Sequence, residues 1–270
     1  MNISVDQSGF EQIRTWLSQR CGIFFPPSKS ELLRQRMERV LRRFGFDDLD
    51  RLAKELLSSQ AQDVELAVMH AASINHTYFF REPDVLERFV DLAVPVVQAQ
   101  ANTRIWSAAC STGEEAYTIA IMLAARLGPS VLNKIDILGT DISGPVVERA
   151  ELGIFPHRQF SQTDPQTITR WFRPTGIEQY QVVPELRDVC TFRRMNLKAT
   201  PYPFARPFHV IFCRNILYYF DQTDQAATVE ALYHCLEPGG LLVTSVTETI
   251  RDLDDRWEPI STGIYRRAQG

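Results

Sequence analysis

The segment RIWSAACSTGEEAYTIAIMLAARL, residues 104–127, decides the fold. It begins with a short apolar run from Ile105 to Ala109 and breaks at the small residues 111–113. It then resumes with apolar residues at helical intervals, namely Tyr117, Ile119, Ala120, Leu123 and Leu127. The pattern predicts a strand, a tight turn and a helix, which is how an open α/β sheet with a ligand crevice usually begins.

The turn in this segment indicates which ligand the crevice holds. Loops that bind pyrophosphate carry several glycines, so that backbone amides can approach the phosphates. Here one glycine, Gly113, is followed directly by Glu114 and Glu115. Two carboxylates would repel a pyrophosphate but suit a cationic nucleoside such as S-adenosylmethionine. The alternative is that both glutamates only complement the helix dipole.

Composition describes an ordinary globular chain. Its 270 residues are 44% hydrophobic and 23% charged, and the net charge of -4 gives no overall case for nucleic-acid binding. Five scattered cysteines, without metal-type pairs, fit a reducing cytoplasm. No signal-peptide layout and no apolar run of ~20 residues is present. We therefore expect a cytoplasmic chain that neither inserts into a membrane nor binds a metal.

Residues from about Ser8 to Ser73 are predicted to form a bundle of four helices. Ser28 and Glu31 have capping-box spacing for the second helix, Gly45 ends it, and a third helix follows Asp48. Apolar residues that should face the bundle core include Phe10, Ile13, Leu17, Leu33, Met37, Val40, Leu52 and Leu56.

The second of these helices has a basic outer face. Glu31 and Glu38 are its only acids, whereas its bases are Lys29, Arg34, Arg36, Arg39, Arg42 and Arg43. Such a face is usually only solvated. Near a catalytic cleft it would also suit an acidic partner, which it would attract by electrostatic steering.

The segment NHTYFFREP, residues 75–83, is expected to link the bundle to an α/β domain. Asn75, Thr77 and Arg81 are separated by even steps, so they would point the same way in an extended segment. The alternative is a packed aromatic linker with Arg81 on the surface. We place a helical domain at residues 1–74, the linker at 75–90 and the α/β domain at 91–270.

Polar residues follow the other predicted strands. Asp141 follows the strand at residues 135–140, and Arg214 with Asn215 follows the strand at 209–213. Ligands bind beyond the carboxyl ends of parallel strands, so these side chains should share a crevice with Glu115 and Asn196. Asp141 can accept hydrogen bonds from ribose hydroxyls or cap the next helix, and the two roles are compatible.

Residues 153–196 interrupt the alternation of strands and helices. They read as a short helix at 164–172 and two short strands at 180–184 and 189–195, which predicts an antiparallel insert at about 155–195. A helix at 224–236 and a hairpin at 257–266 are expected to end the chain.

The chain resembles the chemoreceptor glutamate methyltransferases of bacteria, the CheR family. The similar segments are NHTYFFRE (75–82), RIWSAACSTGEEAYTIA (104–120), GTDIS (139–143), FHVIFCRNILYYFD (208–221) and LEPGGLLV (236–243). The likeness covers nearly the whole chain. It implies an α/β, Rossmann-like methyltransferase sheet that binds S-adenosylmethionine, with an N-terminal helical domain and a small antiparallel β insert.

The resemblance also implies an activity and its residues. The family transfers a methyl group to glutamates on the cytoplasmic methylation helices of membrane chemoreceptors, giving methyl esters and S-adenosylhomocysteine. The reaction serves sensory adaptation, and we expect a monomer. The implied cofactor contacts are Asn75, Thr77, Arg81, Glu115, Asp141, Asn196, Leu197, Arg214 and Asn215. The resemblance implies that Arg81 and Tyr219 lie at the reaction centre, and that Arg36, Arg39, Arg42 and Arg43 meet the receptor.

One departure from the family concerns receptor tethering. Some members hold a pentapeptide at the receptor's C-terminus with a glycine-rich loop of the β insert. Here the stretches 173–178 and 185–188 contain one glycine between them. We therefore expect direct recognition of the methylation helices, independent of the pentapeptide.

Three other functions fit the sequence less well. A nicotinamide dehydrogenase would need more glycines in the turn after the first strand. A methyltransferase for a small molecule does not explain the helical domain and its basic face. A binding module without turnover is disfavoured because the polar residues expected at the site are present.

Overall fold

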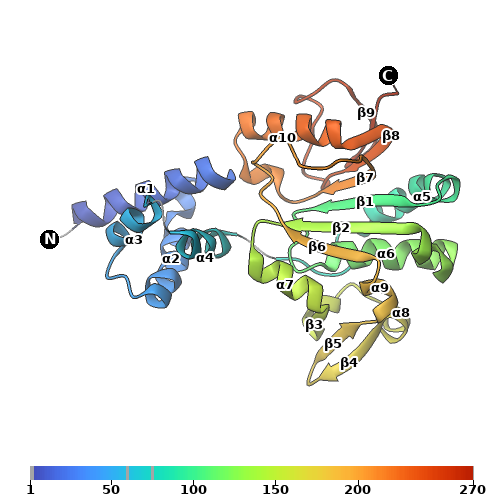
Figure 1. Cartoon of the computed structure of the whole chain (residues 1–270), viewed down its shortest axis with the longest axis horizontal. Helices are drawn as coiled ribbons and strands as arrows, with labels where there is room; N and C mark the ends of the chain where they lie inside the picture. Colours follow the sequence, from blue (N-terminus) through green and yellow to red (C-terminus); the bar gives the residue numbers. More distant parts are fainter. Residues whose placement is uncertain (1–2, 59–60, 74–75, 270) are drawn as a thin grey trace.

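A computed structural model describes residues 3–58, 61–73 and 76–269. Figure 1 shows a small helical part beside a larger α/β part. The predicted bundle is confirmed by four helices, α1 (Ile3–Cys21), α2 (Ser30–Phe44), α3 (Leu49–Leu56) and α4 (Gln62–Ala72). The expected apolar positions are buried in one cluster, with Ile13, Leu17, Leu33 and Leu52 fully enclosed.

Two of the three predicted helix boundaries in the bundle are confirmed. Gly45 ends α2 with a left-handed φ of 70°, and the Asp48 carboxylate caps α3 by accepting the N–H of Arg51. The predicted capping box is wrong. A 3₁₀ turn occupies Pro27–Lys29, so α2 begins later, at Ser30, and no side chain caps it within the described residues.

The segment after α4 turns into a helix sooner than expected. Helix α5 (Pro83–Ala99) begins at Pro83, because a proline fits the first helical position, where its missing N–H is not needed. Residues 83–90 of the predicted linker are therefore helical. Asn75 lies outside the described residues, and the domain boundaries themselves stay a prediction.

The main sheet is mostly parallel, as the alternating pattern predicts. Its strand order is β6-β2-β1-β7-β8-β10-β9, and the first five of these strands run parallel. The closing hairpin β9–β10 forms as expected, and its strand β10 pairs antiparallel with β8. The strands are β1 (Thr103–Ala108), β2 (Ile135–Asp141), β6 (Cys190–Arg194), β7 (Phe208–Cys213), β8 (Leu236–Val243), β9 (Trp257–Ser261) and β10 (Ile264–Arg267).

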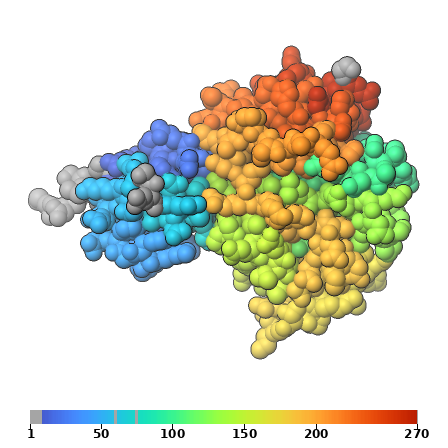
Figure 2. Space-filling model, in the orientation of Figure 1, coloured from blue at the N-terminus to red at the C-terminus, as the bar shows by residue number. Residues whose placement is uncertain are grey.

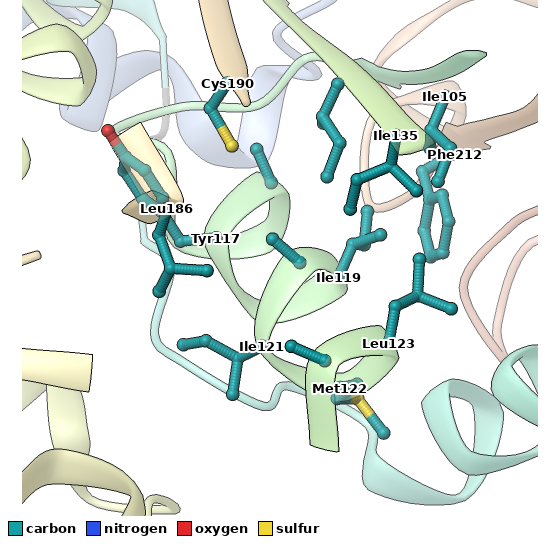
Figure 3. Close-up of a cluster of buried hydrophobic side chains, with 14 of the residues drawn as sticks. Ile105, Tyr117, Ile119, Ile121, Met122, Leu123, Ile135, Leu186, Cys190 and Phe212 are labelled. Carbon is teal, nitrogen blue, oxygen red and sulfur yellow. The ribbon is translucent and has the colours of Figure 1, made fainter. Parts of the chain in front are cut away.

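The segment from β1 into α6 (Glu114–Leu127) lies at the centre of the largest core cluster. Figure 3 shows Ile119 and Leu123 of α6 directed toward Ile105 and Phe212 of the sheet, with Tyr117 and Leu186 on another side of the helix. Burying one such side chain contributes about 1.5–3 kcal/mol. This packing fixes the start of α6 against the carboxyl ends of β1 and β7.

The β insert contains different strands from those predicted. Its strands are β3 (Ile154–Pro156), β4 (Phe172–Gly176) and β5 (Gln179–Val182) in the order β3-β5-β4. The predicted strand at 189–195 is β6, which instead pairs parallel with β2. Gly139 of β2 makes room for it, since a Cβ there would lie 2.5 Å from the Phe192 ring. Strand pattern alone does not reveal this choice of partner.

The remaining helices cover the sheet or join its strands. They are α7 (Gly144–Leu152), α8 (Pro165–Trp171), α9 (Pro184–Arg187) and α10 (Gln222–Cys235). The described helices include none that combines the length and apolar character required to cross a bilayer. Figure 2 shows the blue and cyan helical part packed against the yellow-green and orange segments of the α/β part.

Candidate active site

A crevice lies where β1, β2 and β7 end, and it consists of two adjoining hollows of about 660 and 680 Å³. The first, the apolar half, includes Ile23, Ile142, Met195 and Leu197 in its lining. The second, the polar half, includes Thr77, Arg81, Glu115 and Arg214. Both halves share the lining residues Ala109, Ser111, Asn215 and Tyr219.

The backbone around the crevice is strained. Ala109, Ser111 and Asn215 adopt left-handed φ values of 65°, 49° and 59°, and Glu82 nearby adopts 59°. Each such residue costs of order 1–3 kcal/mol and persists only where its surroundings enforce it. Strain of this kind concentrates at functional sites, and here it brings the chain between β1 and α6 close to the end of β7.

Asp141 stands between the two loops that border the apolar half. Its Oδ2 accepts the N–H of Ser111 at 3.0 Å, and its Oδ1 accepts the N–H of Ser143 at 2.9 Å. Burial raises the pKa of this carboxyl, and the two N–H donors oppose that rise. The carboxylate thus binds the N–H of Ser143, the residue before α7, and no side chain caps the helix itself within the described residues. Asp141 also lines the crevice with lone pairs to spare.

The polar half is organised around the buried Arg214. Its Nη1 contacts Glu115 Oε2 at 3.0 Å, and its Nη2 contacts Glu82 Oε2 at 3.2 Å. Nη2 also donates to the backbone oxygen of Arg81 at 2.6 Å, which holds the linker against the sheet. The other oxygen of Glu115 accepts the Ser107 hydroxyl at 2.7 Å. Arg214 is thereby neutralised from both sides.

Two acids that support the crevice from behind, Glu82 and Glu248, were missed by sequence reasoning. Burial opposes ionisation of Glu82, but the Ser245 hydroxyl, Arg214 and the Val246 N–H together lower its pKa. Glu248 accepts the N–H groups of Asn215 at 2.6 Å and Leu217 at 2.9 Å, which supports the strained loop after β7. Glu248 could have been found, because it follows the end of β8, where polar residues of such sheets meet the ligand.

Glu114 does not face the crevice, contrary to the interpretation of the paired glutamates. It is fully buried, and its oxygens accept the Thr112 hydroxyl at 2.7 and 2.8 Å and the side-chain amide of Gln159. Burial raises its pKa to about 7. Of the pair, only Glu115 lines the crevice, so Glu114 joins the turn after β1 to the insert.

The apolar half is completed by the helical domain. Asn196 Nδ2 donates to the backbone oxygen of Arg20 at 2.7 Å, and Lys198 Nζ donates to that of Ser18 at 3.0 Å. These are among the last carbonyls of α1, and that of Ser18 also accepts the N–H of Gly22 at 3.0 Å. Lys198 also pairs with Asp224. Cys21, Ile23 and Ala72 of the helical domain line the same hollow as Leu197.

Tyr219 stands where the two halves meet. Burial raises the pKa of the Tyr219 hydroxyl above that of an ordinary tyrosine, and so does its contact of 3.3 Å with the Tyr218 hydroxyl. Tyr219 is therefore neutral at physiological pH. Its backbone oxygen accepts the N–H of Phe24 at 2.9 Å. Arg81 lies in the polar half, and its Nη1 donates to the backbone oxygen of His76 at 3.2 Å.

The four basic residues of α2 that are predicted to meet a partner have different surroundings. Arg36 donates to the backbone oxygens of Ala72 and Ser73, at the end of α4, at 2.7 and 3.2 Å. Arg42 pairs with Glu38 at 3.6 Å. Arg39 and Arg43 are exposed and line a separate hollow with His70. Their role in docking stays a prediction.

The residues of the crevice suit a cationic nucleoside. The apolar half offers Leu197 and Ile142 for a base and Asp141 for ribose hydroxyls, while the polar half offers Glu115 for an ammonium group. Two buried polar atoms of the crevice, Ser111 Oγ and Arg214 Nε, have no hydrogen-bond partner in the described part of the chain. Such atoms usually belong to a site that a ligand or water completes.

A parallel sheet with acids after its first two strands, and without a glycine-rich phosphate loop, fits the class of S-adenosylmethionine-dependent methyltransferases. The family model "CheR methyltransferase, SAM binding domain" matches residues 75–265, and "CheR methyltransferase, all-alpha domain" matches residues 8–69. This chain therefore belongs to the CheR methyltransferase family, and S-adenosylmethionine is its cofactor. The family resemblance, the fold class and the cofactor are confirmed.

Individual relatives agree along nearly their whole length. The chemotaxis protein methyltransferase of Escherichia coli strain K12 is 34% identical over 266 residues, which are 97% of this chain and 92% of that protein. Chemotaxis protein methyltransferase 2 of Pseudomonas aeruginosa PAO1 is 35% identical over 269 residues, 96% of this chain and 92% of that protein.

The free energy of unfolding should depend on pH because Glu114 is buried. Its pKa is about 7 in the fold against an ordinary value of 4.5, so its contribution to stability is complete below about pH 4.5 and is lost as pH rises through 7. Glu114→Gln should therefore gain stability relative to the parent protein between pH 5 and pH 8, by about 1–3 kcal/mol in urea unfolding. Glu148→Gln on the exposed face of α7 is the control. A pH-independent difference would mean that Glu114 is ionised in the fold.

Cofactor affinity should depend on Asp141. Asp141→Ala removes the acceptor for ribose hydroxyls and releases the N–H groups of Ser111 and Ser143, so calorimetry with S-adenosylhomocysteine should show about 10–100-fold weaker binding. Asp136→Ala, at the far end of the same strand, should leave affinity unchanged. Equal affinity of both variants would remove Asp141 from the cofactor site.

Proposed function

We propose that this chain is a protein-glutamate O-methyltransferase, which methylates glutamate side chains on the cytoplasmic methylation helices of membrane chemoreceptors and so serves sensory adaptation. The observation that carries the proposal is the polar half of the crevice. There Arg81 and the neutral hydroxyl of Tyr219 border the space beside Glu115. A carboxylate substrate would find a cation and a hydroxyl donor next to the cofactor. The names of the relatives, chemotaxis protein methyltransferases, support the receptor as substrate.

The reaction needs positioning more than acid–base chemistry. A glutamate side chain has a reference pKa of about 4.3, so it is already an anion at neutral pH. Bound S-adenosylmethionine supplies a methyl group activated by its sulfonium. With the cofactor bound, Arg81 and Tyr219 would hold the glutamate carboxylate so that its oxygen could take the methyl group, with S-adenosylhomocysteine as the leaving group. The protein contributes by aligning the carboxylate and excluding water.

Each crevice residue has a proposed role in this alignment. Asp141 accepts the ribose hydroxyls, Glu115 accepts the ammonium group, and Asn196 and Leu197 flank the adenine. Thr77, Arg214 and Asn215 line the polar half and complete the predicted contacts to the amino-acid end. Both Nη groups of Arg214 are bound by carboxylates, Nη1 by Glu115 and Nη2 by Glu82, so Arg214 acts mainly by fixing Glu115 and the linker.

Tyr219 and Arg81 are proposed to act on the reacting groups. With its pKa raised, Tyr219 serves as a hydrogen-bond donor rather than as a base, and it orients the attacking carboxylate or holds the methyl group. Arg81 orients the incoming glutamate or the methionine carboxylate of the cofactor. Both side chains line the polar half, within one hollow.

Recognition is proposed to be direct, without the receptor's C-terminal pentapeptide. Adding a peptide strand to a sheet needs a free edge with available backbone groups. The edge strand β4 of the insert contains Pro174, which lacks an N–H, and Arg173 donates to the backbone oxygens of Thr169, Arg170 and Phe172 beside it. These features make β4 a poor template. We further propose that the chain acts in the cytoplasm as a monomer.

Transfer of a labelled methyl group tests the proposed function. Receptor-containing membranes incubated with the protein and methyl-labelled S-adenosylmethionine should gain a base-labile label on glutamates. Receptors that lack their last five residues should be labelled at the same rate, within about twofold. Receptor binding without label would indicate a module without turnover, and a strong loss on truncation would contradict pentapeptide independence.

The Tyr219 hydroxyl should matter for the chemical step. Tyr219→Phe removes one donor beside the reacting carboxylate, so kcat should fall about 10–100-fold while the affinity for S-adenosylhomocysteine changes little. Tyr218→Phe makes the same change on the more exposed neighbour and should have a much smaller effect. Equal rates for Tyr219→Phe and the parent protein would exclude this role.

A further inference from the structure

A second group of bases faces the active site from the α/β domain. A hollow of about 1120 Å³ lies between α4, the linker, α7 and the 3₁₀ turn His157–Phe160. Arg149 of α7 and Arg158 of the turn are exposed and line it. No Asp or Glu side chain is among its described lining residues. The hollow is therefore cationic although the whole chain is acidic.

This hollow adjoins the basic hollow on α2. His70 lines both, and Arg39 and Arg43 line the second, again without a described carboxylate. Burial lowers the pKa of His70, and the charges of Arg39, Arg43 and Arg149 lower it further, so guanidinium groups of α2 and α7 converge on one imidazole. A contact of 2.6 Å between His70 Nδ1 and Ser143 Oγ joins α4 to the start of α7.

The same hollow adjoins the polar half of the crevice. His76, Thr77 and Tyr78 line both this hollow and the polar half of the crevice that contains Arg81 and Tyr219. A chain segment lying in the two basic hollows can thus present a side chain to the polar half. The linker forms the boundary between this hollow and the polar half of the crevice.

We propose that Arg149 and Arg158 form the second wall of a basic groove, opposite Arg39 and Arg43, and that this groove holds an acidic helix of the protein substrate. The inference rests on the proposed function and extends it, because it adds α7 and the insert to the docking surface of α2. A helix about 10–12 Å across presents carboxylates at spacings of three and four residues along one face. Acids flanking the target glutamate would contact both walls while the target enters the polar half.

The groove should act on the encounter rather than on the chemical step. Exposed ion pairs contribute little individually, but a field of one sign accelerates association with an oppositely charged partner. Reversing the charges of the groove should therefore raise the KM for the receptor and change how that KM depends on salt. The kcat and the cofactor affinity should be preserved.

The test uses labelled methyl transfer from S-adenosylmethionine to the receptor. It compares the parent protein with two double variants and one single variant of the full chain. Arg149→Glu/Arg158→Glu should raise the receptor KM about tenfold or more at low salt, and Arg149→Lys/Arg158→Lys should largely retain the parent value. Arg88→Glu on the exposed face of α5, outside both hollows, is the control for a basic residue changed to an acid. The difference from the parent protein should shrink between about 50 and 300 mM salt.

Each outcome decides the proposal. A KM equal to that of Arg88→Glu would overturn the groove while leaving the proposed function intact. A parallel loss of S-adenosylhomocysteine affinity, measured by calorimetry, would show damage to the fold and also count against the groove. Unchanged transfer with lost binding of a DNA probe would assign the surface to nucleic acid. An inactive parent protein would instead refute the proposed function.

Discussion

The active site depends on the burial of one cation, the guanidinium of Arg214. Its partners Glu115 and Glu82 come from the start of α6 and the end of the linker, and Arg214 itself follows β7. Removing one partner from a buried pair leaves an uncompensated charge, which costs about 3–5 kcal/mol. The three segments are therefore held together as a unit. The linker, which carries Thr77 and Arg81, gains a fixed position beside the sheet although it belongs to no strand.

Strain and its compensation occur at the same places in this site. Asn215 is held in a left-handed conformation, and the Glu248 carboxylate accepts both its N–H and that of Leu217. Ser111 is similarly held, and Asp141 accepts its N–H. In both cases a buried acid binds the backbone of a strained loop. The raised pKa of each acid reflects burial, which the N–H donors only partly offset. These acids thus shape the crevice as well as line it.

Local patterns were sufficient for the bundle, for most strands of the main sheet and for the residues at strand ends, but not for β3 and β4 of the insert. Glu115, Asp141 and Arg214 follow apolar runs, and parallel topology brings such positions together. The roles of Glu114 and Glu82 were beyond sequence reasoning, because each depends on contacts with residues distant in the chain, Gln159 for Glu114 and Arg214 for Glu82. The pairing of β6 with β2 was missed for a related reason. The fit of Phe192 over Gly139 is a three-dimensional property.

The end of α1 has a consequence for how this architecture can be modified. The backbone oxygens of Ser18 and Arg20 accept donors from Lys198 and Asn196, and the N–H of Phe24 binds the backbone oxygen of Tyr219. A peptide carbonyl cannot be substituted by mutation, so this seam is specified by the path of the helix rather than by its side chains. A chimera that exchanges the helical domain for that of a relative can retain the seam despite a very different sequence, whereas inserting a single residue near position 20 would misalign it.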